Sequence, residues 1–352
     1  MENIKSENQG FEKAQHKIAF RLDGGPEIGM GHVVRCLAIA ASLNKRIPVD
    51  ILFVVNKSPE VISLIKNAGF DVIPYGHKGS ADSYNILYNY QPDIIFNDLP
   101  HSSASYMKKI QSLCRTINYD DGGEGCIYAD YLFHVQYKTR TEFSGNKGYL
   151  CGLEYLILRD EFSLYRKKES FRVINHDPQN IMIMMGGSDP DNLTTMVLKD
   201  IQNLEYCLDI NIVIGAGYIF HDPLNQCIKE SKHSVALFAG INAEELLNLM
   251  KQADIGIAHY GITGLEMACT GLPLVAIAHN REEFTENRLT EYGFCIDAGL
   301  WDNLKEGDIL SCVNQLITSK ALREQVSKRG MKSIDAKGLH RVIDLLIKLQ
   351  KR

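Results

Sequence analysis

No Cys-x-x-Cys pair occurs among the nine cysteines of this 352-residue chain, and an odd number of thiols cannot all pair within one molecule. A zinc knuckle and a disulfide framework are therefore not expected, and this cysteine usage is typical of the reducing cytoplasm. No stretch approaches the ~20 apolar residues of a membrane span. The first seventeen residues also lack the apolar core of a signal peptide. We expect a soluble, cytoplasmic protein.

Positive charge is not in excess either, because the formal net charge is −5 at pH 7. Nonspecific binding to nucleic acid or to an anionic membrane depends on a basic surface, so neither partner is expected. The apolar fraction of 45% and the charged fraction of 23% are ordinary for a globular protein. The length fits two domains of ~150 residues each.

The chain does contain a regular alternation of short apolar runs with helical patterns, as in a doubly wound parallel α/β sheet. The alternation stops in the charged segment 163–178 and then starts afresh. We expect a flexible tail over 1–16, an N-terminal Rossmann-like domain over 17–162, a linker over 163–178 and a C-terminal Rossmann-like domain over 179–352. The two domains are expected to face each other across a cleft. The amphipathic end, 342–352, is expected to pack back on a domain, for example the N-terminal one.

Twelve apolar runs are the expected strands, and helical patterns fit between them, notably at 32–43, 59–68 and 103–113. The runs cover residues 17–22, 49–55, 70–75, 92–98, 115–120 and 130–135 in the first half, and 180–187, 210–217, 235–238, 253–259, 272–279 and 293–299 in the second.

The first strand runs into a glycine-rich loop and a helix that together hold Asp23, Gly29, Gly31, His32 and Arg35. Ligands of open α/β sheets bind beyond the carboxyl ends of strands, and glycines with a helix start let backbone N–H groups approach an anion. The helix dipole disfavours imidazolium here, so His32 indicates a proton acceptor beside a phosphate. The alternative is a tight turn with a capping or packing histidine. The spacing is not that of the dinucleotide-binding G-x-G-x-x-G.

Two similar loops follow strands in the second half. In "MMGGSDPDN", Gly187 and Ser188 follow a buried strand in the chain. In "AHYGITGLE", the start of a helix holds Thr263, Gly264 and Glu266. Amides of such turns can hold phosphate. A carboxylate at a helix start is commonly only a dipole partner, but it can also accept both hydroxyls of a ribose. Together the three loops favour a nucleoside diphosphate as ligand.

"FRLDGGPEIGMGHVVRCLAIAASL" resembles the N-terminal signature of the nucleotide-sugar hydrolase of pseudaminic acid biosynthesis, which forms one family with spore-coat polysaccharide proteins in the glycosyltransferase-B superfamily. The likeness continues through "GLEYLILRDEF", "IMIMMGGSDPDNL" and "HNREE", over most of residues 18–300. The chain departs from the hydrolase at "NDLP", which stands in place of Asp-His-Tyr so that Asp98 alone matches. It departs again where Arg281 follows Asn280 instead of Gln.

The resemblance implies two Rossmann-like domains with the substrate in the cleft, and no metal or other cofactor. It also implies that His32 activates the attacking group. Asp23 or Asp98 would orient its imidazole or hold sugar hydroxyls, and Arg35 would bind the substrate or be structural. The substrate contacts would be amides near Ile241 and Asn242 at the uracil, Gly187, Ser188, Thr263 and Gly264 at the diphosphate, Glu266 at the ribose, and Gly29, Gly31 and Asn280 elsewhere.

We therefore expect hydrolysis of a UDP-linked deoxy-amino sugar to free sugar and UDP, in the biosynthesis of nonulosonic (pseudaminic or legionaminic type) acid or surface polysaccharide. The alternative is a metal-independent glycosyltransferase with a polysaccharide, lipid or protein acceptor, in which His32 would deprotonate the acceptor hydroxyl. A noncatalytic nucleotide-sugar sensor or inactive subunit is a third candidate. The missing His-Tyr after Asp98 favours it, and the intact His32 and Glu266 oppose it.

The remaining candidates are weaker. Tyr119, Asp120 and Asp121, which precede two glycines, can line the cleft or simply belong to a polar turn at a strand end. Cys36 is expected as a packed thiol. Four scattered histidines show no metal-ligand spacing and are expected at the surface or in packing: His101, His134, His221 and His233.

Overall fold

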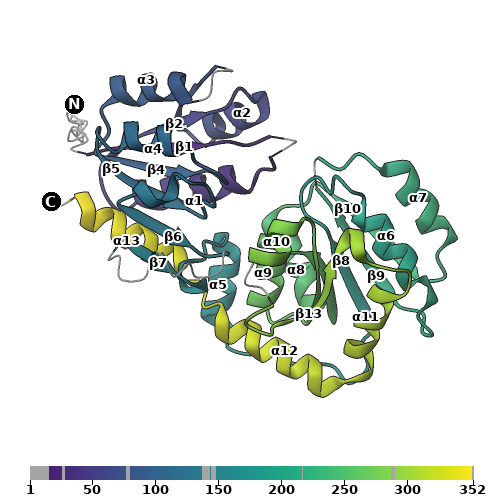
Figure 1. The fold of residues 1–352 in the computed structure, drawn as a ribbon. Coiled ribbons are helices and arrows are strands. Elements are labelled where there is room, and N and C mark those ends of the chain that lie inside the picture. Colours follow the sequence, from purple (N-terminus) through teal and green to yellow (C-terminus); the bar gives the residue numbers. More distant parts are fainter. Residues whose placement is uncertain are drawn as a thin grey trace, which may run out of the picture.

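The chain folds into two α/β domains, each built on one parallel sheet (Figure 1). The computed structural model describes residues 16–25, 28–76, 80–136, 143, 148–215, 217–286 and 290–350.

The N-terminal domain has a seven-stranded sheet in the order β3-β2-β1-β4-β5-β6-β7. The strands β1, β2, β4 and β5 are covered on both faces and therefore read as nearly continuous apolar runs. Aromatic rings pack across the central strands, with ring centroids 5.1 Å apart for Phe20 and Phe53 and 5.5 Å apart for Phe20 and Phe96. The strands are β1 (His16–Leu22), β2 (Val49–Val55), β3 (Asp71–Pro74), β4 (Ile94–Asp98), β5 (Arg115–Tyr119), β6 (Tyr131–His134) and β7 (Tyr149–Cys151). The helices are α1 (Gly31–Asn44), α2 (Pro59–Asn67), α3 (Ser80–Tyr90), α4 (Ala104–Ile110) and α5 (Asp160–Lys168).

The C-terminal domain repeats this plan on a six-stranded sheet in the order β10-β9-β8-β11-β12-β13. Its strands are β8 (Asn180–Met184), β9 (Asp209–Ile214), β10 (Ser234–Ala239), β11 (Ile255–His259), β12 (Leu274–Ala278) and β13 (Cys295–Leu300). Its helices are α6 (Leu193–Asp200), α7 (His221–Glu230), α8 (Ala243–Gln252), α9 (Ile262–Cys269), α10 (Arg281–Glu286), α11 (Asp308–Thr318) and α12 (Lys320–Ser333).

In each sheet the strand order reverses beside the first strand of the domain. β1 lies between β2 and β4, and β8 lies between β9 and β11. Ligands of open α/β sheets bind outside the carboxyl ends of the strands at such a reversal. The loops that follow β1, β4, β8 and β11 are therefore the segments where a ligand site is expected.

The last helix, α13 (Gly338–Gln350), returns to the N-terminal domain, as Figure 1 shows in yellow. Asp344 on this helix lies 2.7 Å from Nη2 of Arg46, and the carbonyl of Leu349 accepts a hydrogen bond from Arg115 at 2.5 Å. A Cβ on Gly338 would lie 2.1 Å from the carbonyl oxygen of Leu156. Only glycine therefore permits this close approach.

The expected linker 163–178 begins inside α5, and its later part is attached to the C-terminal domain. Arg172 donates to the carbonyls of Met250 at 3.0 Å and Lys251 at 3.2 Å. These carbonyls lie at the end of α8, where helix carbonyls lack partners within the helix. These contacts attach the later part of the segment to the C-terminal domain.

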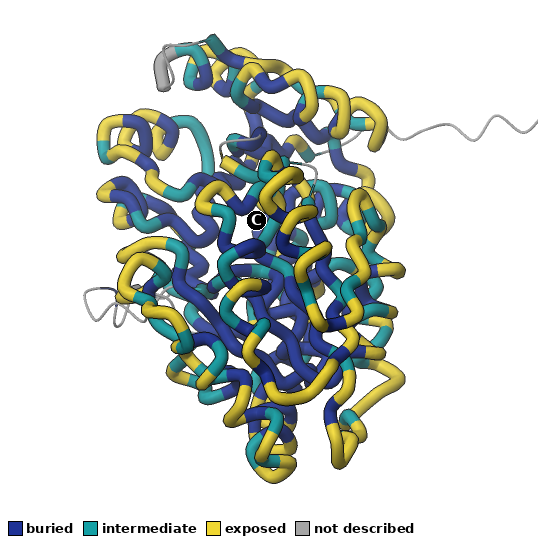
Figure 2. The backbone as a smooth tube through the Cα atoms, turned by 90° about the vertical axis from the view of Figure 1, so that its right-hand side faces the viewer, coloured by how far each residue is buried: buried dark blue, intermediate teal, exposed yellow. Residues whose placement is uncertain are grey.

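The expected fold class is confirmed, and each expected strand overlaps a strand of the structure. The short edge strand β7 was not predicted. Figure 2 shows buried backbone, in dark blue, running through the interior and exposed turns, in yellow, on the outside. Within the described ranges, none of the helices has the length and apolar character needed to cross a membrane.

Candidate functional site

Two adjoining cavities lie between the domains, at the carboxyl ends of the strands. The first has a volume of about 430 Å³ and the second about 370 Å³. Both are lined by Gly31 and Arg35 from α1 and by His259 and Ile262 from the C-terminal domain, so they form parts of one cleft. Each is within the size range of small-molecule sites.

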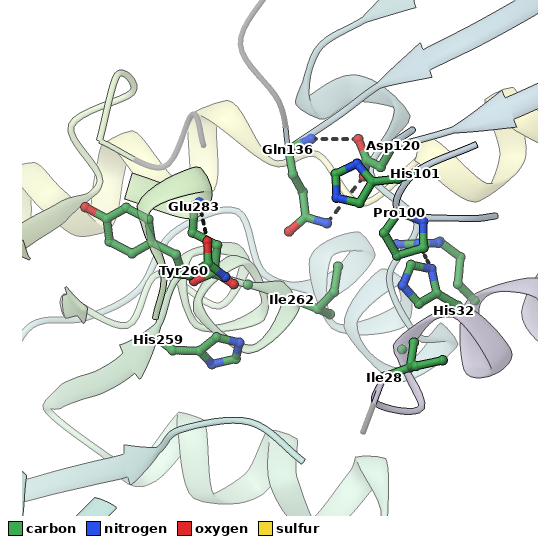
Figure 3. A pocket seen from close by; sticks show the side chains of 14 residues that line it. Ile28, His32, Pro100, His101, Asp120, Gln136, His259, Tyr260, Ile262 and Glu283 are labelled. Carbon is green, nitrogen blue, oxygen red and sulfur yellow. Dashed lines mark hydrogen bonds between the residues drawn. The ribbon is translucent and has the colours of Figure 1, made fainter. Parts of the chain in front are cut away.

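His32 lies in the first turn of α1 and lines the first cavity (Figure 3). Its Nδ1 is 2.7 Å from Oδ1 of Asp98, the last residue of β4. β1 and β4 are parallel neighbours, so the loop after β1 and the end of β4 meet at one edge of the sheet. This adjacency joins two residues that are 66 positions apart in the chain.

Arg35, one turn further along α1, binds the same carboxylate. Its Nε donates to Oδ2 of Asp98 at 2.7 Å and its Nη2 to Oδ1 at 2.6 Å, while the guanidinium lies 4.5 Å from the centre of the Tyr119 ring. Burial acts to raise the pKa of Asp98, but the charges and hydrogen bonds of Arg35 and His32 hold that pKa well below its usual range. Burial likewise acts to lower the pKa of Arg35, and Asp98 raises it overall. Arg35 and Asp98 are therefore a permanently charged pair.

This pair bears on which ring nitrogen of His32 carries the hydrogen. An ionised carboxylate only accepts hydrogen bonds, so the 2.7 Å contact with Asp98 favours a hydrogen on Nδ1, which also lies 3.1 Å from Nη2 of Arg35. In the neutral imidazole, Nε2 is then an acceptor. The side chain of His32 is 19% exposed, whereas that of Asp98 is fully buried. The arrangement offers a proton acceptor at the cavity, held in place by a buried anion.

The first cavity continues toward the ends of β5 and β6. Asp120 has a left-handed backbone with φ 49°, which is uncommon outside glycine. Its carboxylate accepts hydrogen bonds from the backbone N–H groups of Val135 at 2.7 Å and Gln136 at 3.1 Å. His101 and Glu283 also line this cavity. These groups place hydrogen-bond donors and acceptors at the cavity.

His259, at the end of β11, forms the opposite wall of the cleft (Figure 3). A Cβ on Gly186 would lie 2.9 Å from its ring, and one on Gly261 would lie 2.5 Å from its Nε2. Its Nδ1 is buried without a hydrogen-bond partner among the residues that the structure describes. Burial, with a smaller effect of His279, lowers the pKa of His259 to about 4. The ring is therefore neutral near pH 7.

Glu266, on α9, lines the second cavity and is 1% exposed. Both of its carboxylate oxygens accept hydrogen bonds from Arg159, with Nε to Oε1 at 2.9 Å and Nη2 to Oε2 at 2.7 Å. Arg159 precedes α5, so this ion pair joins two segments 107 residues apart. Burial raises the pKa of Glu266, and Arg159 opposes that effect.

The structure brings part of the predicted site set to the cleft. The residues at the first or second cavity are Gly29, Gly31, His32, Arg35, Gly187, Thr263, Glu266 and Asn280. Within the described residues, the lining of these two cavities does not include Asp23, Asp98, Ser188, Ile241, Asn242 or Gly264.

Two of these residues have other partners. Oδ1 of Asp23 accepts hydrogen bonds from Nη1 of Arg21 at 2.7 Å and from the hydroxyl of Tyr75 at 2.5 Å. Asn242 caps the start of α8, and its backbone N–H, predicted to face the uracil, donates to Oε2 of Glu245 at 2.9 Å. Of the two aspartates considered for orienting His32, Asp98 is the one that contacts it.

Arg159 and His259 were not selected from the sequence, and His101, expected at the surface or in packing, lines the first cavity. His259 ends an apolar strand just before a glycine turn, which is a usable signal for a ligand site. Arg159 lies inside "GLEYLILRDEF", but its pairing with Glu266 has no local signal.

Comparison with known proteins gives three relatives at modest identity, and no family model matches the chain. An uncharacterized protein of Methanocaldococcus jannaschii, MJ1062, is 33% identical over 272 residues, which are 75% of this chain and 56% of that protein. The chain thus spans little more than half the length of this relative. The spore coat polysaccharide biosynthesis protein SpsG of Bacillus subtilis is 26% identical over 94% of this chain and 97% of its own length. The UDP-2,4-diacetamido-2,4,6-trideoxy-beta-L-altropyranose hydrolase of Campylobacter jejuni is 24% identical over 53% of this chain and 65% of its own length.

Solved structures share the fold. MurG of Acinetobacter baumannii matches with a TM-score of 0.68 at 13% identity, covering 94% of this chain and 99% of that one. The UDP-GlcNAc 2-epimerase of Neisseria meningitidis, bound to UDP-GlcNAc, matches with a TM-score of 0.64 at 12% identity, covering 94% of this chain and 100% of that one.

Proposed function

For a chain with the glycosyltransferase-B fold, we propose hydrolysis of a UDP-linked deoxy-amino sugar to the free sugar and UDP. The product would serve the biosynthesis of a nonulosonic acid or a surface polysaccharide. Two relatives support this proposal, since one is named for spore coat polysaccharide biosynthesis and the other for hydrolysis of a UDP-linked trideoxy sugar.

The observation that carries the proposal is the 2.7 Å contact between Nδ1 of His32 and Asp98, with the ring at the cavity. Nε2 of His32 would take a proton from a water molecule, whose oxygen attacks the anomeric carbon from the side opposite the phosphate. The bond from that carbon to the phosphate oxygen breaks, and its electron pair leaves with UDP. Asp98 would stabilise the imidazolium, and such general-base assistance typically contributes about 10²–10⁴-fold.

The C-terminal wall would hold the nucleotide. The N-terminus of α9 favours negative charge, and the backbone amides of its first turn would stabilise the departing diphosphate. Glu266 would accept hydrogen bonds from the ribose, and the neutral ring of His259 adds a further N–H donor beside the phosphates. The remaining contacts of this proposal are Gly187 and Thr263 at the diphosphate, both of which line the second cavity.

The test is to incubate the pure protein with candidate UDP-sugars and no acceptor, and to measure free sugar and free UDP. Release of both in equal amounts is expected, and it should be lost in His32→Asn. A matched control is His221→Asn, because His221 also begins a helix but lies outside both cavities. Equal rates in the His32 and His221 variants would contradict the proposed base.

Sugar transfer is the second candidate, because the hydroxyl of an acceptor can take the place of water at Nε2 of His32. The same incubation separates the two reactions. Release of UDP only after a polysaccharide, lipid or protein acceptor is added would replace hydrolysis by transfer.

A further inference from the structure

Arg159 and Glu266 form a two-point ion pair at the second cavity, and neither the hydrolytic step nor the fold explains why a buried carboxylate stands there. The side chain of Glu266 is 2% exposed and that of Arg159 is 29% exposed. Each carboxylate oxygen of Glu266 accepts one hydrogen bond from Arg159 and so uses one of its lone-pair directions. A carboxylate has about four such directions, so the pair retains acceptor capacity for a ligand.

The ionisation of Glu266 depends on this arginine. Burial raises the pKa of Glu266 and is the largest effect, Arg159 lowers that pKa through its charge and hydrogen bonds, and Glu161 raises it further. Arg35, at the same cavity, is already paired with Asp98. The charged or titratable groups around Glu266 are Arg159 and Glu161 at the start of α5, Arg35 of α1, His259 of β11, and Cys269 on its own helix.

We propose that Arg159 is a positioning residue that holds the Glu266 carboxylate by two hydrogen bonds and thereby makes the second cavity select a ribonucleotide over its 2′-deoxy analogue. This inference rests on the proposed function, in which Glu266 binds the ribose. An ionised carboxylate can accept a hydrogen bond from both ribose hydroxyls, whereas a protonated one presents a donor to one of them. Each charge-assisted bond contributes about tenfold or more in affinity.

The experiment measures the dissociation constants of UDP and 2′-deoxy-UDP by calorimetry between about pH 5.5 and about pH 8.5, a range above the usual pKa of a carboxyl, because burial raises the pKa of Glu266. The measure is the ratio of the two constants, because ionisation of the phosphates affects both ligands alike and cancels. The wild-type protein is expected to prefer UDP by about tenfold or more at every pH. In Arg159→Gln the preference should fall toward one at the acidic end and recover at the alkaline end.

Two variants serve as controls. Arg159→Lys keeps the positive charge and should retain a preference that does not change with pH. Arg341→Gln removes another two-point pair, between Arg341 and Asp335, which lies outside both cavities, and should behave as the wild type. Melting temperatures of all variants identify those that fold.

A preference in Arg159→Gln that stays pH-independent and equal to that of the wild type would overturn the inference, and would leave Arg159 as a structural tie. Should Arg159→Gln not fold, Glu266→Gln decides: it is expected to lose the preference at every pH, and a retained preference overturns the inference. Wild-type protein that does not bind UDP would overturn this inference together with the proposed function. Selective UDP binding without hydrolysis would overturn the proposed reaction and leave this inference standing.

Discussion

The two walls of the cleft come from the same kind of domain, yet they differ in where their charge lies. On the N-terminal wall, a fully buried anion, Asp98, is held by Arg35 and by the histidine that faces the cavity. On the C-terminal wall, His259 is neutral and the charge of Glu266 is balanced by Arg159 from outside that domain's sheet. In the proposed function, the first wall carries out proton transfer and the second binds the diphosphate through amides and neutral donors.

The largest effect expected from this difference is on turnover. His32→Asn removes the proton acceptor but keeps a polar side chain, so turnover should fall by about 10²-fold or more. Nucleotide affinity should change little, because the proposed nucleotide site lies on the other wall. Turnover and UDP affinity are measured on one preparation, along with its melting temperature. A folded variant with wild-type turnover would assign His32 a packing role.

A second effect, on stability, is expected when the buried pair of the N-terminal wall is broken. Arg35→Met leaves Asp98 buried with His32 and the weak thiol donor of Cys36 as its partners, and losses of this kind cost about 3–5 kcal/mol in free energy of unfolding. The control is Arg46→Met, since Arg46 pairs with Asp344 at the surface and such pairs contribute about 0–1 kcal/mol. Urea unfolding of both variants checks the contrast, and equal losses would contradict it.

The sequence predicted the strands well because buried parallel strands are continuous apolar runs. It missed β7 because Tyr149–Cys151 is three residues long and only half-buried, which leaves no pattern to read. The fold class follows from the alternation of strands and helices alone.

The site was harder to predict, because its contacts depend on strand order. His32 was selected from its own loop, but choosing Asp98 over Asp23 as its partner requires β1 and β4 to be neighbours. The pairing of Arg159 with Glu266 depends on the crossing between the domains, which no local pattern encodes. Local chemistry could be predicted, whereas pairing over long separations could not.

A third effect concerns the C-terminal wall, where His259 makes the free energy of unfolding depend on pH. The pKa of His259 is lowered to about 4 in the folded protein, and the unfolded chain has a histidine pKa of about 6.5. The unfolded state then binds the proton more tightly, so this residue makes the free energy of unfolding fall as the pH drops from about 6.5 to about 4, by about 3 kcal/mol at most. In His259→Gln, the free energy of unfolding measured with urea should depend less on pH over that window. A His259 resonance that titrates near pH 6.5 would refute the prediction.

The smallest effect on turnover is expected at Asp23, and it sharpens the choice of partner for His32. Asp23→Asn removes a charge that contacts Arg21 and Tyr75 rather than His32, so turnover in the folded fraction should stay close to that of the wild type. Asp98→Asn removes the anion that fixes the ring and stabilises the imidazolium, so its turnover should fall far more. Both variants lose one charge beside an arginine and differ mainly in their contact with His32. Turnover corrected for the folded fraction is the measurement, and a loss in Asp23→Asn equal to that in Asp98→Asn would show that both aspartates act on the histidine.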